Sequence, residues 1–139
     1  MANSERVKNV ARIAMETQKK GNDVVVVVSA PAGMTDNLIK MAKDITSNPH
    51  AREMDMLLAT GEQTSIALLA MAIQEAGGKA ISFTGSQVGI VTDTAHTKAK
   101  IQSIDADKIK KELSQGKVVI VAGFQGRTEN MDITTLGIS

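Results

Sequence analysis

The sequence has 139 residues, of which 42% are hydrophobic, and its 16 basic and 15 acidic residues give a net charge of +1. A chain of this length can bury a hydrophobic core, and without cysteine it forms no disulfide bond or zinc–thiolate site and has no cysteine nucleophile. The balanced charge and the 1% share of aromatic residues argue against nucleic-acid binding, which uses basic surfaces and stacking platforms.

The sequence shows no apolar run of the roughly 18 residues that a membrane span needs. The N-terminal stretch MANSERVKNVAR is polar and lacks the apolar centre of a signal peptide. We therefore expect a cytoplasmic protein with no membrane partner.

Four elements are predicted in the first half of the chain. Apolar residues at helical spacing predict a helix over 4–20. The continuous β-branched run over 24–28 is typical of a strand buried on both faces of a parallel sheet. Two further helices are expected over 34–45 and 52–75, each followed by residues that end helices, Ser-Asn-Pro and Gly-Gly.

The second half alternates shorter elements. A strand is expected over 80–84, and the alternating pattern around 93–97 suggests a hairpin or two short extended stretches. A helix capped by Asp105 is predicted to run through 113, and the run over 118–122 reads as another buried strand.

The remaining stretch, 123–139, shows no sustained period and is expected to be loop. Helices that alternate with buried strands predict an α/β sandwich with a mostly parallel sheet. No linker, repeat or low-complexity segment divides the sequence, so we expect a single domain over residues 1–139.

Three strand ends are candidates for a site, because ligands of open parallel sheets gather outside the carboxyl ends of the strands. These ends are SAPAGMTDN, FTGSQVG and AGFQGRT, and such small residues let backbone N–H groups approach a ligand closely. Ser29, Thr35 and Asp36 lie in the first of them. Alternatively, Thr35 and Asp36 only cap the following helix and Ser29 is a plain turn residue.

Glu62 stands out within the apolar helical run MLLATGEQTSIALLAMAI. A buried carboxylate is costly unless something pairs with it, and Gly61 weakens a helix interior, so this pair of residues indicates a functional or strained position. The alternative is a helix boundary at Gly61 that leaves Glu62 in a solvated first turn. His50 and His96 each stand alone in the sequence, and we expect no metal site.

Five stretches, read in order, resemble the aspartate kinases, a branch of the amino acid kinase family: GNDVVVVVSA…GMTDNL, AREMDMLLATGEQTSIALLAMAI, SFTGSQVGIVTD, GKVVIVAGFQG and DITTLG. The resemblance covers essentially the whole sequence. It implies a three-layer α/β/α sandwich and a transferase that phosphorylates the β-carboxylate of L-aspartate with ATP and Mg²⁺, the first step toward lysine, threonine and methionine. Catalysis of that kind consists mainly of positioning and of cancelling negative charge.

The resemblance also assigns roles to residues. It implies that Glu62 holds the amino group of aspartate, that Thr35, with Asp36 and Asn37 beside it, belongs to the substrate loop, and that Ser29 lies close to the transferred phosphoryl group.

Several motifs and parts that are typical of the family are not in this sequence. The Lys-Phe-Gly-Gly-Thr-Ser and Arg-Gly-Gly-Ser-Asp motifs, the nucleotide-binding half and the regulatory domains are not in it, and Pro31-Ala32 replaces a Met-led pair. No catalytic residue is therefore assigned. We expect this N-terminal portion of a catalytic domain to be inactive alone, to bind L-aspartate weakly at best and to hold neither ATP nor Mg²⁺ tightly. The alternative is a catalytically dead scaffold or interaction module, and in either case an exposed sheet or helix surface could support a homo-oligomer.

Overall fold

The structure, a computed structural model, describes residues 4–136. Its helices and strands are, in groups, α1 (Ser4–Lys19), α2 (Met34–Ile45), α3 (Ala51–Glu75) and α4 (Asp107–Ser114), and β1 (Val25–Val28), β2 (Ala80–Phe83), β3 (Val91–Thr92), β4 (Ile101–Ser103), β5 (Val118–Ala122), β6 (Gln125–Arg127) and β7 (Ile133–Thr135). The four predicted helices and the three predicted buried strands are all present, with ends within two residues of those expected.

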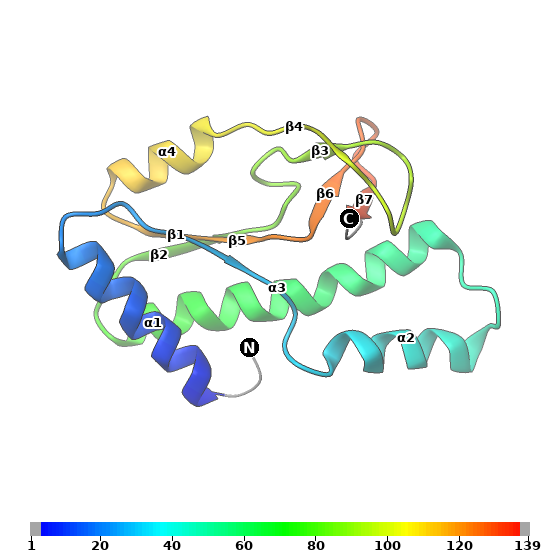
Figure 1. Ribbon diagram of the computed structural model, residues 1–139, viewed down its shortest axis with the longest axis horizontal. Coiled ribbons are helices and arrows are strands. Elements are labelled where there is room, and N and C mark those ends of the chain that lie inside the picture. Colours follow the sequence, from blue (N-terminus) through cyan, green and yellow to red (C-terminus); the bar gives the residue numbers. More distant parts are fainter. Residues whose placement is uncertain (1–3, 137–139) are drawn as a thin grey trace.

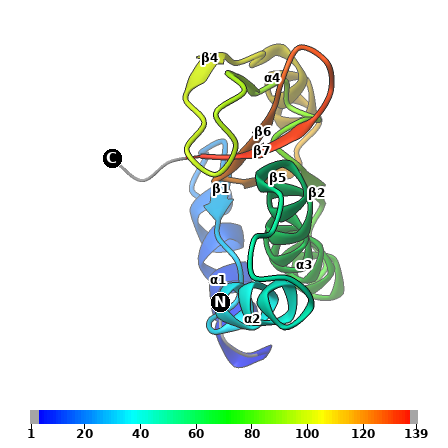
Figure 2. The same cartoon turned by 90° about the vertical axis from the view of Figure 1, so that its right-hand side faces the viewer.

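The main sheet has the strand order β1-β5-β2, and all its pairs are parallel. Figure 1 shows α4 above this sheet and α3 below it, with α1 beside α3. The view turned by 90° in Figure 2 shows the same succession of layers. The predicted three-layer α/β/α arrangement with a parallel sheet is confirmed for these elements.

Strand β5 lies in the centre of the sheet, and all of its side chains are buried. Val118, Ile120 and Ala122 point into the core that α1 and α3 cover, while Val119 and Val121 point into the core that α4 covers. This alternation is what a strand between two helical layers requires.

Strand β1 is the edge of the sheet, which corrects the prediction that the valine run is buried on both faces. Val25 is 43% exposed and Val27 is 62% exposed. A run of β-branched residues predicts a strand, but it does not reveal whether a neighbouring strand or helix covers it.

A second sheet has the order β4-β3-β6-β7. Its antiparallel pair β3–β4 is the expected hairpin around 93–97, and β6 pairs parallel with β3 and antiparallel with β7. The expectation that 123–139 is loop is wrong for β6 and β7, because strands of three residues are too short to show a period; residues 137–139 lie outside the described part. This sheet is mixed, so only the main sheet is parallel throughout.

Helix α4 begins later than predicted. Its N-cap is Ala106, which makes no side-chain capping bond, and Asp105 lies outside the helix. The Asp105 carboxylate accepts a hydrogen bond from the Asp107 N–H at 3.0 Å, which closes a turn ahead of the helix.

Within residues 4–136, α3 is the one helix that is long and apolar enough to cross a membrane. The expectation that no such stretch exists is therefore wrong. Helix α3 contacts α1, α2, both sheets and the cores between them, and it contains the buried acids Asp55 and Glu62. These are the contacts of a core helix in a soluble α/β protein, which passes the same test of length and composition.

Candidate functional site

A cavity of about 940 Å³ lies where the end of β1, the start of α2, the middle of α3, the β3–β4 loop and β7 meet. In Figure 1 this place is the junction between β1, α2 and α3, below β7. The cavity lies at the carboxyl end of β1, as the rule for open parallel sheets predicts.

Three predicted site residues line this cavity: Ser29, Thr35 and Glu62. They come from the end of β1, the first turn of α2 and the middle of α3, so the fold brings together segments that are distant in sequence. Asp36 and Asn37 are not among the lining residues, and their side chains are exposed in the first turn of α2.

Neither Thr35 nor Asp36 caps α2 with its side chain. The N-cap is Gly33, whose φ of 81° lies in the left-handed region, and it makes no side-chain capping bond. The alternative that Thr35 and Asp36 only cap the helix is therefore wrong. The Thr35 side chain lies at the cavity instead.

Helix α3 passes the β1–α2 loop closely at Gly61. A Cβ atom on Gly61 would lie 2.9 Å from the Cβ of Ala30, and α3 continues through this position without a break. The alternative of a helix boundary at Gly61 is therefore wrong. The absence of a side chain at Gly61 allows this close approach, and the next residue of α3, Glu62, lines the cavity.

The Glu62 carboxylate is buried, with the residue 5% exposed. The Phe124 N–H donates to Oε2 at 3.0 Å, and the Gln125 side-chain amide donates to Oε1 at 3.2 Å. Burial raises the pKa of Glu62, and these two hydrogen bonds oppose that rise in part. Among residues 4–136, no lysine, arginine or histidine forms a salt bridge with Glu62.

Gln125 joins two of the predicted strand ends, its own and FTGSQVG, to helix α3. It is 2% exposed, and its Oε1 accepts a hydrogen bond from the Gly85 N–H at 3.2 Å. Its Nε2 donates to the carbonyl of Ala59 at 3.3 Å as well as to Glu62. Gln125 belongs to AGFQGRT, a stretch that the sequence indicated, but its contact with Glu62 was not predicted.

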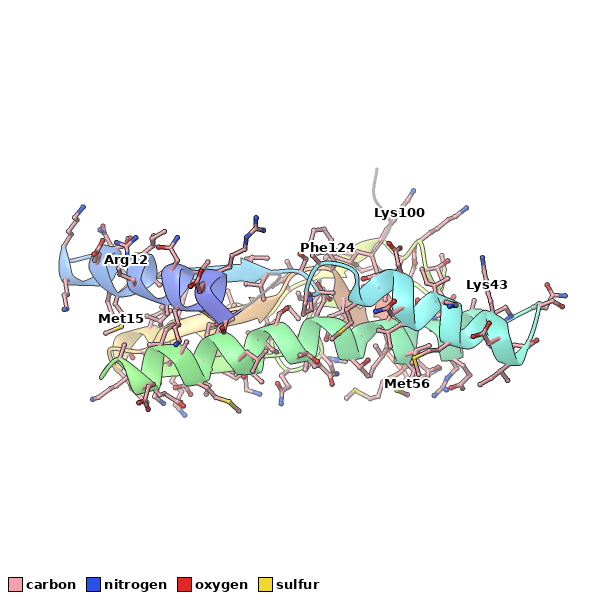
Figure 3. All side chains as sticks on the ribbon, turned by 90° about the horizontal axis from the view of Figure 1, so that it is seen from below. Arg12, Met15, Lys43, Met56, Lys100 and Phe124 are labelled. Atoms are coloured by element: carbon pink, nitrogen blue, oxygen red, sulfur yellow. The ribbon has the colours of Figure 1, made fainter. Side chains whose placement is uncertain are left out.

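The sequence reasoning missed the wall that the β3–β4 loop contributes. Thr97, Lys98, Ala99 and Lys100 line the cavity together with Thr135 of β7. Figure 3 shows Lys100 and Phe124, another lining residue, on the same side of the ribbon. Lys98 and Lys100 therefore bring positive charge to the same cavity that the Glu62 carboxylate lines.

The prediction that His96 stands alone is wrong. Its Nδ1 lies 2.8 Å from Oδ2 of Asp55, a residue of α3 with no exposed surface. Asp55 precedes Glu62 by two helical turns, so this spacing is the signal that could have drawn attention to it. His50 is the N-cap of α3 and makes no side-chain capping bond.

A cavity with a buried carboxylate and two lysines suits a small ligand that carries both an ammonium group and carboxylates. An ionised Glu62 accepts hydrogen bonds and attracts an ammonium group in surroundings that screen charge poorly. The lysines attract anionic groups.

Comparison with known proteins supports the resemblance. Residues 1–138 match the model of the amino acid kinase family. The aspartokinase of Geobacillus stearothermophilus is 56% identical over 133 residues, covering 96% of this chain and 33% of that protein. Aspartokinase 2 of Bacillus subtilis (strain 168) is 53% identical over 133 residues, with coverage of 96% and 33%.

Two solved structures that are similar to this chain are also aspartate kinases. The aspartate kinase from Synechocystis has a TM-score of 0.79 at 49% identity, covering 99% of this chain and 22% of that one. The E. coli aspartokinase III in complex with aspartate and ADP has a TM-score of 0.82 at 20% identity, covering 97% and 41%, which supports the fold alone. The chain spans about a third of the length of the curated relatives reported above.

Proposed function

Because this chain belongs to the amino acid kinase family, we propose that it carries the aspartate-binding part of an aspartokinase catalytic site. In the whole protein, that site would transfer the γ-phosphoryl group of ATP to the β-carboxylate of L-aspartate. Residues 1–139 would form a single domain, the N-terminal portion of the catalytic domain, in a cytoplasmic enzyme.

The observation that carries the proposal is Glu62, a buried carboxylate on a cavity wall with no cationic partner in residues 4–136. A ligand ammonium group would supply the missing charge. Its binding would favour the ionised form of Glu62 and lower the raised pKa of that carboxyl. Affinity for aspartate should therefore increase as pH rises through the pKa of Glu62.

The other lining residues would hold the acidic parts of the substrate. The Thr35 hydroxyl lies in the first turn of α2, where the helix dipole favours anions, and Ser29 would lie near the transferred phosphoryl group. Asp36 and Asn37, beside Thr35, would shape the same loop. Lys98 and Lys100 would attract the two carboxylates.

ATP would be the phosphoryl donor of the whole enzyme, with Mg²⁺ as its metal. In the part of the chain that the structure describes, no group of three or more histidine, aspartate and glutamate side chains is placed to hold a metal ion. These residues therefore form no protein cage for a metal ion, and we expect neither Mg²⁺ nor ATP to bind tightly to residues 1–139 alone. The chain by itself should transfer no phosphoryl group.

A second candidate function is a scaffold or interaction module without catalysis. The exposed edge strand β1, with Val25 and Val27 facing outward, is the observation that favours it. A scaffold of this kind would need no binding of aspartate at Glu62.

Two measurements separate these functions. In a longer protein that contains this chain and the rest of the aspartokinase length, Glu62→Gln should raise the KM for aspartate at least about tenfold, while the KM for ATP stays unchanged. Glu75→Gln, an exposed change at the end of the same helix, is the matched control. A longer protein that forms no ADP from aspartate and MgATP, or an unchanged KM in Glu62→Gln, would contradict the proposal.

A further inference from the structure

Asp55 is a buried carboxylate that the proposed function does not use. It has no exposed surface; its Oδ1 accepts hydrogen bonds from the β3–β4 loop and from β7, and its Oδ2 accepts them from the loop. His96 Nδ1 donates to Oδ2 at 2.8 Å, and the Thr97 N–H lies 3.1 Å from each oxygen. The Thr135 hydroxyl donates to Oδ1 at 2.5 Å.

These bonds hold the loop at a strained position. Thr97 has a φ of 70°, in the left-handed region, which is rare for a β-branched residue. Such conformations persist where the surroundings fix them, and they cluster at functional sites. Here the Thr97 N–H is fixed directly by the Asp55 carboxylate.

The strained loop is also one wall of the cavity. Thr97, Lys98 and Lys100 line it together with Thr135, whereas Asp55 is not among the lining residues. Neither Lys98 nor Lys100 forms a salt bridge with another side chain in residues 4–136. Asp55 itself does not line the cavity, but it holds the wall that does.

We propose that Asp55 is a positioning residue, which fixes the β3–β4 loop so that Lys98 and Lys100 line the same cavity as Glu62. Through these lysines it sets the affinity of the cavity for a ligand that carries carboxylates. The identity of the ligand, L-aspartate, rests on the proposed function; the positioning of the loop does not.

The first test needs no ligand. In Asp55→Asn, the Thr97 amide should exchange with solvent at least about tenfold faster, and the ¹⁵N signals of the His96 ring should change because the carboxylate partner is lost. Asp44→Asn, an exposed change on α2, is the control and should alter neither signal. If Asp55→Asn fails to fold, Thr135→Val removes one bond to Asp55 and should accelerate Thr97 exchange in the same direction. An unchanged exchange rate in the folded variants would overturn the proposal.

The second test is a mutant cycle on L-aspartate binding. Asp55→Asn and the pair Lys98→Ala and Lys100→Ala should each weaken binding about tenfold, and the triple variant should be no weaker than the lysine pair. Additive losses would overturn the proposal, because a general structural defect would act independently of the lysines. If the unmodified chain binds no L-aspartate, the proposed function fails, and Thr97 exchange alone decides the role of Asp55.

Discussion

Glu62 is the residue at which folding and binding oppose each other. Burial raises the pKa of its carboxyl above the ordinary value of 4.5, which means that the folded chain prefers the protonated form. Because the folded state binds this proton more tightly than the unfolded state does, Glu62 contributes most stability below the ordinary pKa. That contribution is lost as pH rises through the raised pKa.

The free energy of unfolding should therefore fall with pH in the unmodified chain relative to Glu62→Gln. Glutamine has no titratable group, so the difference in unfolding free energy between the two proteins isolates the titration of Glu62. Urea denaturation of both proteins at several pH values between about 4 and 7 measures it. Glu75→Gln, at an exposed position, should show the same pH dependence as the unmodified chain. If the unfolding free energy of the unmodified chain minus that of Glu62→Gln stays constant or grows with pH, the raised pKa of Glu62 is contradicted.

Sequence alone predicted that Glu62, Thr35 and Ser29 belong to a site, because Glu62 breaks a local pattern and the other two follow the predicted strand over 24–28. It did not predict Asp55 or Gln125. Asp55 meets Thr97 42 residues later, and Gln125 meets Glu62 across 63 residues. Contacts of that kind depend on how the layers pack. The two-turn spacing from Glu62 marks Asp55 as a residue of interest, but it does not reveal which residues Asp55 contacts.

At the scale of elements, the close approach of α3 to the β1–α2 loop depends on Gly61. In Gly61→Ala, the new methyl group would lie 2.9 Å from the Cβ of Ala30, which also lines the cavity. Overpacking costs about 1–3 kcal/mol, whereas alanine gains up to about 1 kcal/mol in helix propensity. We expect a net loss of about 1–2 kcal/mol, measured by urea denaturation.

Thr60→Ala, an exposed neighbour on α3, is the control for this change and should stay within about 0.5 kcal/mol of the unmodified chain. A stabilised Gly61→Ala protein would show that the loop moves away freely. The close contact would then not fix the position of Glu62.

The elements themselves were largely predictable, and the reasons for the exceptions are physical. Long helices and the buried strand β5 have enough residues to show their periods, so sequence predicts them within two residues. Strands β6 and β7 have three residues each, which is too short to show a period; they pair with each other, and β6 also pairs with the distant strand β3. The exposure of β1 also escaped prediction, since it depends on which strand occupies the edge.

At the scale of the whole molecule, the outer edge of β1 is open in the described structure. Its position at the end of the sheet order and its exposed valines predict self-association by strand pairing. Val27→Lys should weaken dimerisation at least about tenfold, because it places a charge on that edge. Light scattering across a concentration series measures this.

Ile45→Lys is the control that distinguishes the β1 edge from the helix surface as the interface. It removes an 86% exposed apolar side chain from α2 and should leave dimerisation unchanged. If the unmodified chain stays monomeric at high concentration, the prediction of a homo-oligomer is wrong. If Ile45→Lys has the larger effect, the helix surface is the interface.

The most direct test of the central claim is an amide NMR titration of the chain with L-aspartate, with Glu62→Gln as its control. We predict that signals near Ser29, Thr35 and Glu62 shift together, and that the same signals stay still in the control. Signals that never move in a well-dispersed spectrum would contradict the claim. The cavity would then belong to a folded chain that shares the family's structure without its binding of aspartate.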